Sequence, residues 1–170
     1  MIIRATKKVL NLNRIKTERN DSPLNDQLPG EWYVDLISLG KPGKFALHYL
    51  HHPTKIVIIV KGRSLKKSEQ LFKDRIRHFL ERHNYNPLIE KFELEGKTKI
   101  YSTNDRGMLS NMNQIKWNSE YHCISSQNPD LIDFNWIEDI SINNLFTTKD
   151  TGKKYLKTKT ILNELLEKNQ

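Results

Sequence analysis

The chain has 170 residues, which is enough for one domain with its own hydrophobic core. Lysine and arginine outnumber the acidic residues by 28 to 20, so the net charge is +8 and the isoelectric point is near 9.5. This basic excess indicates a polyanionic partner, which could be RNA, DNA or an acidic protein surface. Cys123 is the only cysteine, which excludes an intrachain disulfide and a cysteine-based zinc site.

The sequence shows no targeting or membrane segment. The first eight residues contain no apolar run of signal-peptide length. The longest apolar run, 56–60, is far too short to span a bilayer. Together with the unpaired cysteine, these features predict a cytoplasmic protein.

The chain begins with the pattern of a short strand followed by a short helix. Ile2, Ile3 and Ala5 indicate the strand, and Thr6 is placed to cap a helix after it. Residues 17–30 are rich in Asn, Asp, Ser and Pro and predict a surface loop.

Three strands are predicted next, at 31–39, 44–51 and 55–61. The connections between them are short and have turn chemistry, which favours an antiparallel meander. The third strand is β-branched throughout from 56 to 60. Such a run predicts burial on both faces and therefore a central place in the sheet.

The second half of the chain predicts mainly helices. Ser64 is placed to cap a long helix to about His83, and a strand is expected at 97–102. The helix after that strand carries Met108, and a Lys-rich connection at 147–159 leads to a terminal helix. No internal repeat or long linker is present. Residues 1–170 are therefore expected to form one α+β domain, with an antiparallel or mixed sheet of about four to five strands covered by helices.

Three short motifs resemble a bacterial family of single-domain proteins of unknown function. They are Ile3-Arg4-x-Thr6-Lys7-Lys8, Trp32-Tyr33 and Thr103-Asn104-x-Arg106-x-x-Leu109-x-x-Met112-Asn113. The resemblance covers most of the chain, although the region before Trp32, the pair His51-His52 and the Lys-rich part after Phe146 depart from the family pattern. It implies one fold unit and supplies no activity.

The third motif forms a strand-to-helix junction, and such a junction exposes backbone N–H groups that can bind an anion. In a continuous helix, Asn104 and Asn111 would share one face, and Arg106 and Asn113 a neighbouring face. The functional interpretation is a phosphate or nucleobase site with Arg106 as a bidentate donor. In the alternative, Asn104 caps the helix and Arg106 pairs with a carboxylate.

Two further groups of cations are candidates for a phosphate backbone. Arg4, Lys7 and Lys8 surround the first predicted helix start, although lysines there oppose the helix dipole and could simply be solvated. The long helix carries a basic stripe of Lys66, Lys73 and Arg77. Charged stripes are usually solvated faces, and this one would bind by charge neutralisation without reading bases.

Three histidines, His48, His51 and His52, lie close together in the chain. On a strand His48 and His52 share a face, whereas His51 points the other way. No third metal ligand stands at a useful spacing, so neither a metal nor another cofactor is expected. An imidazole titrates near neutrality, so His48 or His52 could act as a base on RNA with Arg106 as phosphate clamp. The alternative is surface histidines near turns.

The first functional hypothesis is a nucleic-acid-binding module, for RNA rather than DNA, that contacts the phosphate backbone. Its expected binding residues are Arg4, Lys7, Lys8, Lys66, Lys73, Arg77, Asn104, Arg106, Asn111 and Asn113. The second is a small metal-independent ribonuclease of the toxin type, with His48, His52 and Arg106 as catalytic residues. The third is an interaction protein, antitoxin-like or an inhibitor, that binds an acidic protein partner.

Overall fold

The computed structural model describes residues 1–17, 26–146 and 155–168. The strands in this part of the chain are β1 (Ile2–Ala5), β2 (Glu31–Ser38), β3 (Phe45–His52), β4 (Val57–Lys61), β5 (Lys99–Ser102), β6 (Leu145–Phe146) and β7 (Leu156–Lys157). The helices are α1 (Lys7–Asn13), α2 (Leu65–Arg82), α3 (Arg106–Ser125), α4 (Phe134–Ser141) and α5 (Thr158–Glu167), with short 3₁₀ helices at Asn86–Leu88 and Glu90–Phe92. This mixture of a sheet and separate helices confirms the predicted α+β class.

The main sheet has five strands in the order β4-β3-β2-β1-β5. The meander predicted from the turns is confirmed, because β2, β3 and β4 pair antiparallel. β1 pairs in parallel with both β2 and β5, so the sheet is mixed. The predicted central place of the third meander strand is wrong, because β4 lies at the edge of the sheet. Its residues are buried because helices cover both of its faces, so continuous burial does not require a strand on each side.

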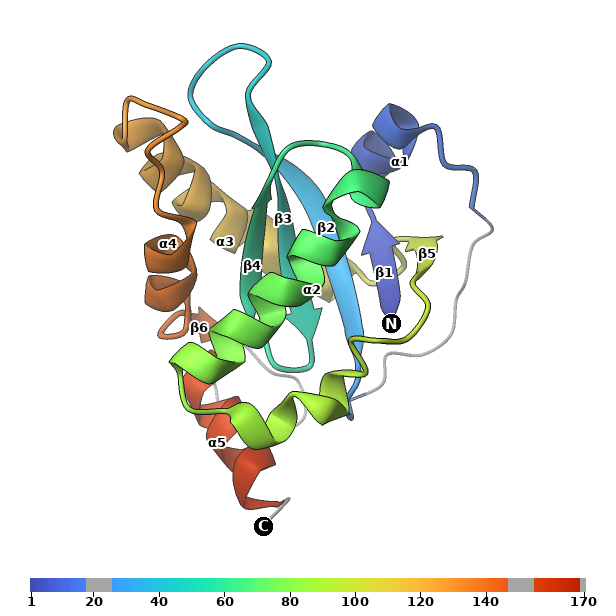
Figure 1. The fold of residues 1–170 in the computed structure, drawn as a ribbon, viewed down its shortest axis with the longest axis vertical. Helices are drawn as coiled ribbons and strands as arrows, with labels where there is room; N and C mark the ends of the chain where they lie inside the picture. Colours follow the sequence, from blue (N-terminus) through green and yellow to red (C-terminus); the bar gives the residue numbers. More distant parts are fainter. Residues whose placement is uncertain (18–25, 147–154, 169–170) are drawn as a thin grey trace.

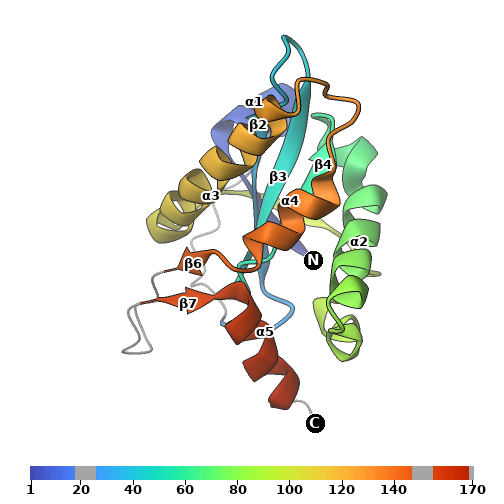
Figure 2. The same cartoon turned by 90° about the vertical axis from the view of Figure 1, so that its left-hand side faces the viewer.

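Helices cover the sheet on both sides, in three layers (Figure 1). Trp32, Val34 and Leu36 point from β2 into a core shared with α1 and α2, whereas Tyr33 and Ile37 point into a core shared with α3 and α4. This is the two-residue alternation expected of a strand. Figure 2 shows α3 and α4 side by side, with β6, β7 and α5 gathered at the C-terminal end.

The helix starts follow their local sequence. Ser64 caps α2 as predicted, because its hydroxyl accepts from the N–H of Lys67. The residue that caps α3 is Asp105, which accepts from the N–H of Met108 and replaces the Asn104 cap of the alternative interpretation. Thr6 occupies the cap position of α1, but its hydroxyl does not bond to the helix. It donates to Asp35 on β2 instead.

The predicted connections fall partly outside the described residues. Of the loop at 17–30, residues 18–25 lie outside them, as do 147–154 of the Lys-rich connection. That connection ends earlier than predicted, because β7 occupies Leu156–Lys157 and α5 begins at Thr158. None of the described helices combines the length and the apolar character needed to cross a membrane.

Candidate functional site

Arg4 lies inside the sheet and does not reach the surface. Its side chain is fully buried, and its guanidinium binds both carboxylate oxygens of Glu31, with Nη2 donating to Oε1 over 3.0 Å. The guanidinium also lies over the ring of Tyr101, 5.9 Å from the ring centroid. A buried charge requires a paired partner. Arg4 therefore ties β1 to both of its neighbouring strands and does not contact a partner molecule.

One residue of each family motif, Thr6, Tyr33 or Asn104, forms a side-chain bond on this face of the sheet. Thr6 donates to Asp35 Oδ1 over 2.8 Å, and Lys116 Nζ from α3 lies 2.5 Å from Asp35 Oδ2. Burial alone would raise the pKa of Asp35, but hydrogen bonds from Lys116 and Thr6 hold it below its usual value. Tyr33 donates its hydroxyl to Asn104 Oδ1 over 2.8 Å. These half-buried bonds join the start of α1 to β2 and α3, and β2 to the segment before α3.

The residues of the predicted junction do not form one helical face. Asn104 precedes α3 and accepts from Tyr33, so it cannot share a helix face with Asn111. Arg106 is exposed in the first turn of α3, Asn111 is half-buried and Asn113 is exposed. The cations on α2 lie in the opposite layer of the molecule.

The predicted stripe on α2 is largely neutralised by carboxylates. Lys73 Nζ lies 3.2 Å from Glu69 and also donates to the carbonyl oxygen of Gly96. Arg77 pairs with Asp74 and with Glu95, the latter over 2.8 Å. Lys66, Lys7 and Lys8 are exposed, and none of them forms an ion pair with another described residue. Only one cation of the stripe therefore remains open to a partner.

The three histidines are buried, contrary to the alternative of surface histidines near turns. As predicted, His48 and His52 point to the α3 side of the sheet and His51 to the other side. His48 Nε2 lies 3.2 Å from the hydroxyl of Ser119, and burial lowers the pKa of His48 to about 4. His48 is fully buried and cannot reach a phosphate from this position, which corrects its assignment as a base. Among the described residues, no cluster of three His, Cys, Asp or Glu is placed to hold a metal ion.

His52 belongs to a small cluster of titratable groups at the end of β3. Its Nε2 lies 2.9 Å from Asp26 Oδ1, and Lys55 Nζ lies 3.4 Å from its Nδ1. Burial, and then the Lys55 charge, lower the pKa of His52, so its imidazole is neutral at pH 7. Burial also lowers the pKa of Lys55 to about 8. A neutral imidazole held by a carboxylate is the arrangement expected of a general base.

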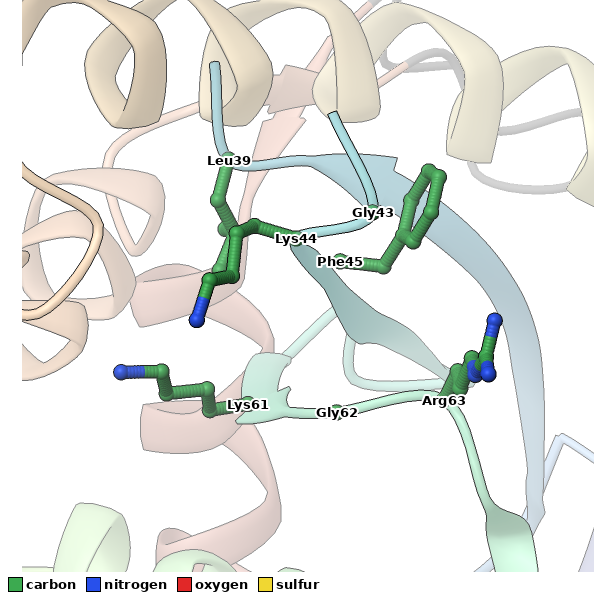
Figure 3. Close-up of a pocket in the computed structure, with 7 residues that line it drawn as sticks. All are labelled: Leu39, Gly43, Lys44, Phe45, Lys61, Gly62 and Arg63. Atoms are coloured by element: carbon green, nitrogen blue, oxygen red, sulfur yellow. The ribbon is translucent and has the colours of Figure 1, made fainter. Parts of the chain in front are cut away.

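An open groove with basic walls lies where two turns meet at one end of the sheet (Figure 3). We call it the basic groove. It is lined by Leu39, Gly43, Lys44, Phe45, Lys61, Gly62, Arg63, Ser64, Lys67, Ser68 and Leu71. Figure 3 shows the amino groups of Lys44 and Lys61 on one side and Arg63 on the other. Lys41 and Lys66, which are also exposed, are close to lining residues in the sequence, in the β2–β3 turn and in the first turn of α2.

Side-chain contacts hold the two turns in place. Asn13, the last residue of α1, donates to the carbonyl oxygen of Arg63 over 3.0 Å and accepts from the N–H of Leu65 over 3.0 Å. Asp130 is the carboxylate beside these cations, and Lys61 Nζ lies 2.5 Å from its Oδ1. The bond from Lys61, with the charges of Lys44 and Lys41, lowers the pKa of Asp130. All three lysines therefore gather around one exposed carboxylate.

The positions of the cations in the turns, combined with the predicted meander, could have indicated this groove from the sequence. Lys41 and Lys44 lie in the β2–β3 turn, and Lys61 and Arg63 follow β4. In an antiparallel meander, the turn before the second strand and the end of the third strand lie at the same end of the sheet. None of these four cations is among the binding residues predicted from the sequence, so the groove is an addition to the predicted sites.

The fold defines the class of protein as a single-unit α+β domain, with a mixed five-stranded sheet between helices. The chain belongs to a family described as a domain of unknown function (DUF6933), whose model matches residues 2–159. This match confirms the resemblance drawn from the three motifs. No curated protein matches the chain significantly.

Proposed function

We propose that the protein is a nucleic-acid-binding module of the cytoplasm that holds the phosphate backbone of RNA, rather than DNA, in the basic groove. The observation that carries this proposal is the concentration of exposed cations around the groove. The six cations are Lys41, Lys44, Lys61, Arg63, Lys66 and Lys67. Among the described residues, only Lys61 of these six forms an ion pair, with Asp130.

The cations suit a backbone ligand because they are solvated, close together and supplied by separate segments. Flexible lysine side chains neutralise phosphates without reading bases, so this contact gives affinity and little sequence preference. The ring of Phe45 is half-buried in the groove and offers a surface on which one unpaired base can stack. We therefore expect single-stranded RNA to bind more tightly than a duplex.

The test is binding of labelled single-stranded RNA, measured by fluorescence anisotropy over a salt series. We expect log Kd to change with log salt with a slope of magnitude about 3–4, because each phosphate contact contributes about 0.7 on a single strand. The triple variant Lys44→Gln, Lys61→Gln, Arg63→Gln removes three of the six cations. It should weaken binding at least about 10-fold at physiological salt and lower the magnitude of the slope by about 2.

The matched control is Lys7→Gln, Lys8→Gln, Arg106→Gln, which removes the same charge from exposed positions outside the groove. This control should keep most of the affinity. If it loses as much affinity as the groove variant, binding depends on net charge or on the predicted junction, and the groove assignment fails. Failure of the wild type to bind RNA at physiological salt, together with co-purification of an acidic protein, would favour a protein partner.

The Asp26, His52 and Lys55 cluster supports a second candidate, a metal-independent ribonuclease of the toxin type. His52 would act as the base, and exposed Arg106 would hold the phosphate from the first turn of α3. The same RNA samples distinguish this function, since a nuclease yields fragments in the presence of a chelator. His52→Ala and Arg106→Ala should each abolish the fragments, whereas His48→Gln, inside the core, should not.

A further inference from the structure

An exposed apolar surface covers the outer sides of α3 and α4. Trp117, Tyr121 and Ile124 recur at spacings of four and three residues along α3, and Trp136 and Ile140 lie one turn apart on α4. We call these five residues the apolar face. Trp117 is 71% exposed and Tyr121 is 62% exposed, and each of the other three is at least 36% exposed. Each stays exposed although Trp136 lies beside the ring of His122 and Ile124 lies beside Gly40 of the β2–β3 turn.

Aromatic rings join the two helices of this face. The ring of His122 on α3 lies 5.6 Å from the ring of Tyr121 and 5.0 Å from that of Trp136 on α4. Figure 2 shows the two helices side by side on this side of the molecule. The apolar face therefore forms one continuous surface and not a set of scattered side chains.

The apolar face carries no charged side chain. From Gly107 to the end of α3, the charged residues are Lys116 and Glu120, and both turn toward the sheet. Lys116 pairs with Asp35, and Glu120 accepts from the N–H of Ser38 over 2.8 Å. On α4, Glu138 is buried, and Asp139 pairs with Arg82 of α2. A protein with a net charge of +8 thus has one large neutral face.

The size of this face approaches that of a dimer interface. The five side chains expose on the order of 500 Å², because a large side chain presents about 150–250 Å² when it is fully exposed. Monomers rarely leave more than a few hundred Å² of contiguous apolar surface in water. A stable interface buries about 800 Å² per partner, and neutral neighbours on α3 such as Asn113, Gln114 and Asn118 can supply the remainder as a polar rim.

We propose that the apolar face binds a second copy of this chain and forms a twofold-symmetric dimer. Two molecules of the same positive charge repel each other through most of their surfaces, and this face is where they can meet without that repulsion. A symmetric dimer places the same patch on both sides, so Trp117 and Tyr121 of each copy meet an equally apolar surface. Along the described helices α3 and α4, these five positions offer a polyanion or an acidic protein no cation. The proposal is independent of RNA binding in the basic groove.

The test is the molar mass of the full chain by sedimentation equilibrium, from about 1 µM to about 200 µM. We expect a concentration-dependent shift from 20.1 kDa to twice that mass. The double variant Trp117→Asp, Tyr121→Asp places charges in the centre of the interface. It should raise the dimer Kd at least about 30-fold, which is the effect expected of central aromatic residues. Both positions are exposed in the single chain, so circular dichroism should remain that of the wild type.

The matched control is Leu12→Asp, which changes an exposed apolar residue on α1, in the opposite layer. It should dimerise as the wild type does. A wild type that stays at 20.1 kDa throughout the series overturns the proposal. So does equal loss of the dimer in Leu12→Asp. A monomer whose tryptophan fluorescence is quenched by single-stranded RNA, with quenching lost in Trp117→Phe, would instead assign the face to stacking on bases.

Discussion

Gly30 lies where the chain enters β2 beneath the β3–β4 turn, and no other residue type fits there. Its φ is +62°, a conformation that side chains disfavour. A Cβ at this position would lie 2.0 Å from the carbonyl oxygen of His52 and 2.8 Å from His51 Nε2. The same His51 nitrogen bonds to the carbonyl oxygen of Pro29 over 2.8 Å. The backbone before β2 is therefore held directly against the end of β3.

Gly30→Ala should destabilise the fold severely, by more than about 4 kcal/mol, because backbone atoms must move to admit the methyl group. Gly43→Ala is the matched control. Gly43 also has a positive φ, +75°, but a Cβ there meets nothing within 4 Å. Gly43→Ala should lower the free energy of unfolding by about 1–2 kcal/mol, which is the strain of the backbone conformation alone. Urea unfolding measures both variants, and equal losses would show that the close contact is unimportant.

His48 and His51 are neutral groups of the core. The carbonyl oxygen of Pro29 can only accept, so His51 carries its proton on Nε2, and its Nδ1 accepts from the hydroxyl of Thr54 over 2.7 Å. Burial lowers the pKa of His51 to about 3 and that of His48 to about 4. Protonation of either ring therefore favours the unfolded chain, in which a histidine titrates near pH 6.5.

The free energy of unfolding should fall as the pH drops below about 6.5, because the unfolded chain then binds protons that the folded core excludes. Each of the two histidines contributes up to about 1.4 kcal/mol per pH unit to this fall, until the pH reaches the pKa of that histidine in the folded protein. His48→Gln removes one of the two titrating histidines and keeps a partner for Ser119. Between pH 6.5 and 4, the slope of its free energy of unfolding against pH should therefore be smaller by up to about 1.4 kcal/mol per pH unit. His78→Gln, at an exposed position on α2, should leave the slope of the wild type. Urea unfolding at a series of pH values gives both curves.

At the scale of elements, β4 shows how an edge strand can be protected. No strand of the described residues pairs with its outer edge, and α4 lies against it with Glu138 buried between them. Glu138 Oε1 accepts from the backbone N–H of Ile59 over 2.8 Å and from Arg75 Nη2 over 2.7 Å. The carboxylate takes the place that the carbonyl group of another strand would occupy. Burial raises the pKa of Glu138 to about 7, although Arg75 opposes this rise.

Glu138→Ala should lower the free energy of unfolding by about 3–5 kcal/mol, because it leaves the N–H of Ile59 without its acceptor and takes from Arg75 its carboxylate partner, although Arg75 still donates to Asn135. Glu138→Gln keeps an amide oxygen as acceptor for the N–H of Ile59. It should lower the free energy of unfolding by less, about 1–2 kcal/mol. Glu95→Ala removes the exposed partner of Arg77 and should remain close to the wild type. Urea unfolding measures all three, and equal losses at position 138 would exclude the acceptor role.

At the scale of the whole molecule, the sheet separates surfaces of different character. The basic groove lies at one end of the meander, beside the start of α2. The apolar face lies on α3 and α4, and the side-chain bonds of Thr6 and Tyr33 lie between the sheet and α3. The predicted binding cations consequently fall on different layers, with Arg4 in the interior and Arg106 and Lys66 on opposite sides.

The sequence by itself determined the elements of this protein. Alternating and helical apolar patterns, the Ser64 cap and the turn residues between the strands are local signals, and they specified the meander, α2 and the α+β class. The three motifs also identified the family, since a motif needs only residue types and spacing.

Only the tertiary structure decided which of these residues face water. Arg4 and His48 have the chemistry of surface ligands, yet packing buries both, because Glu31 and Ser119 arrive from distant parts of the chain. The edge position of β4 depended on α4, which supplies Glu138 from 79 residues away. Burial and proximity are properties of distant segments brought together. A local pattern therefore predicts an element and not the surface on which its side chains lie.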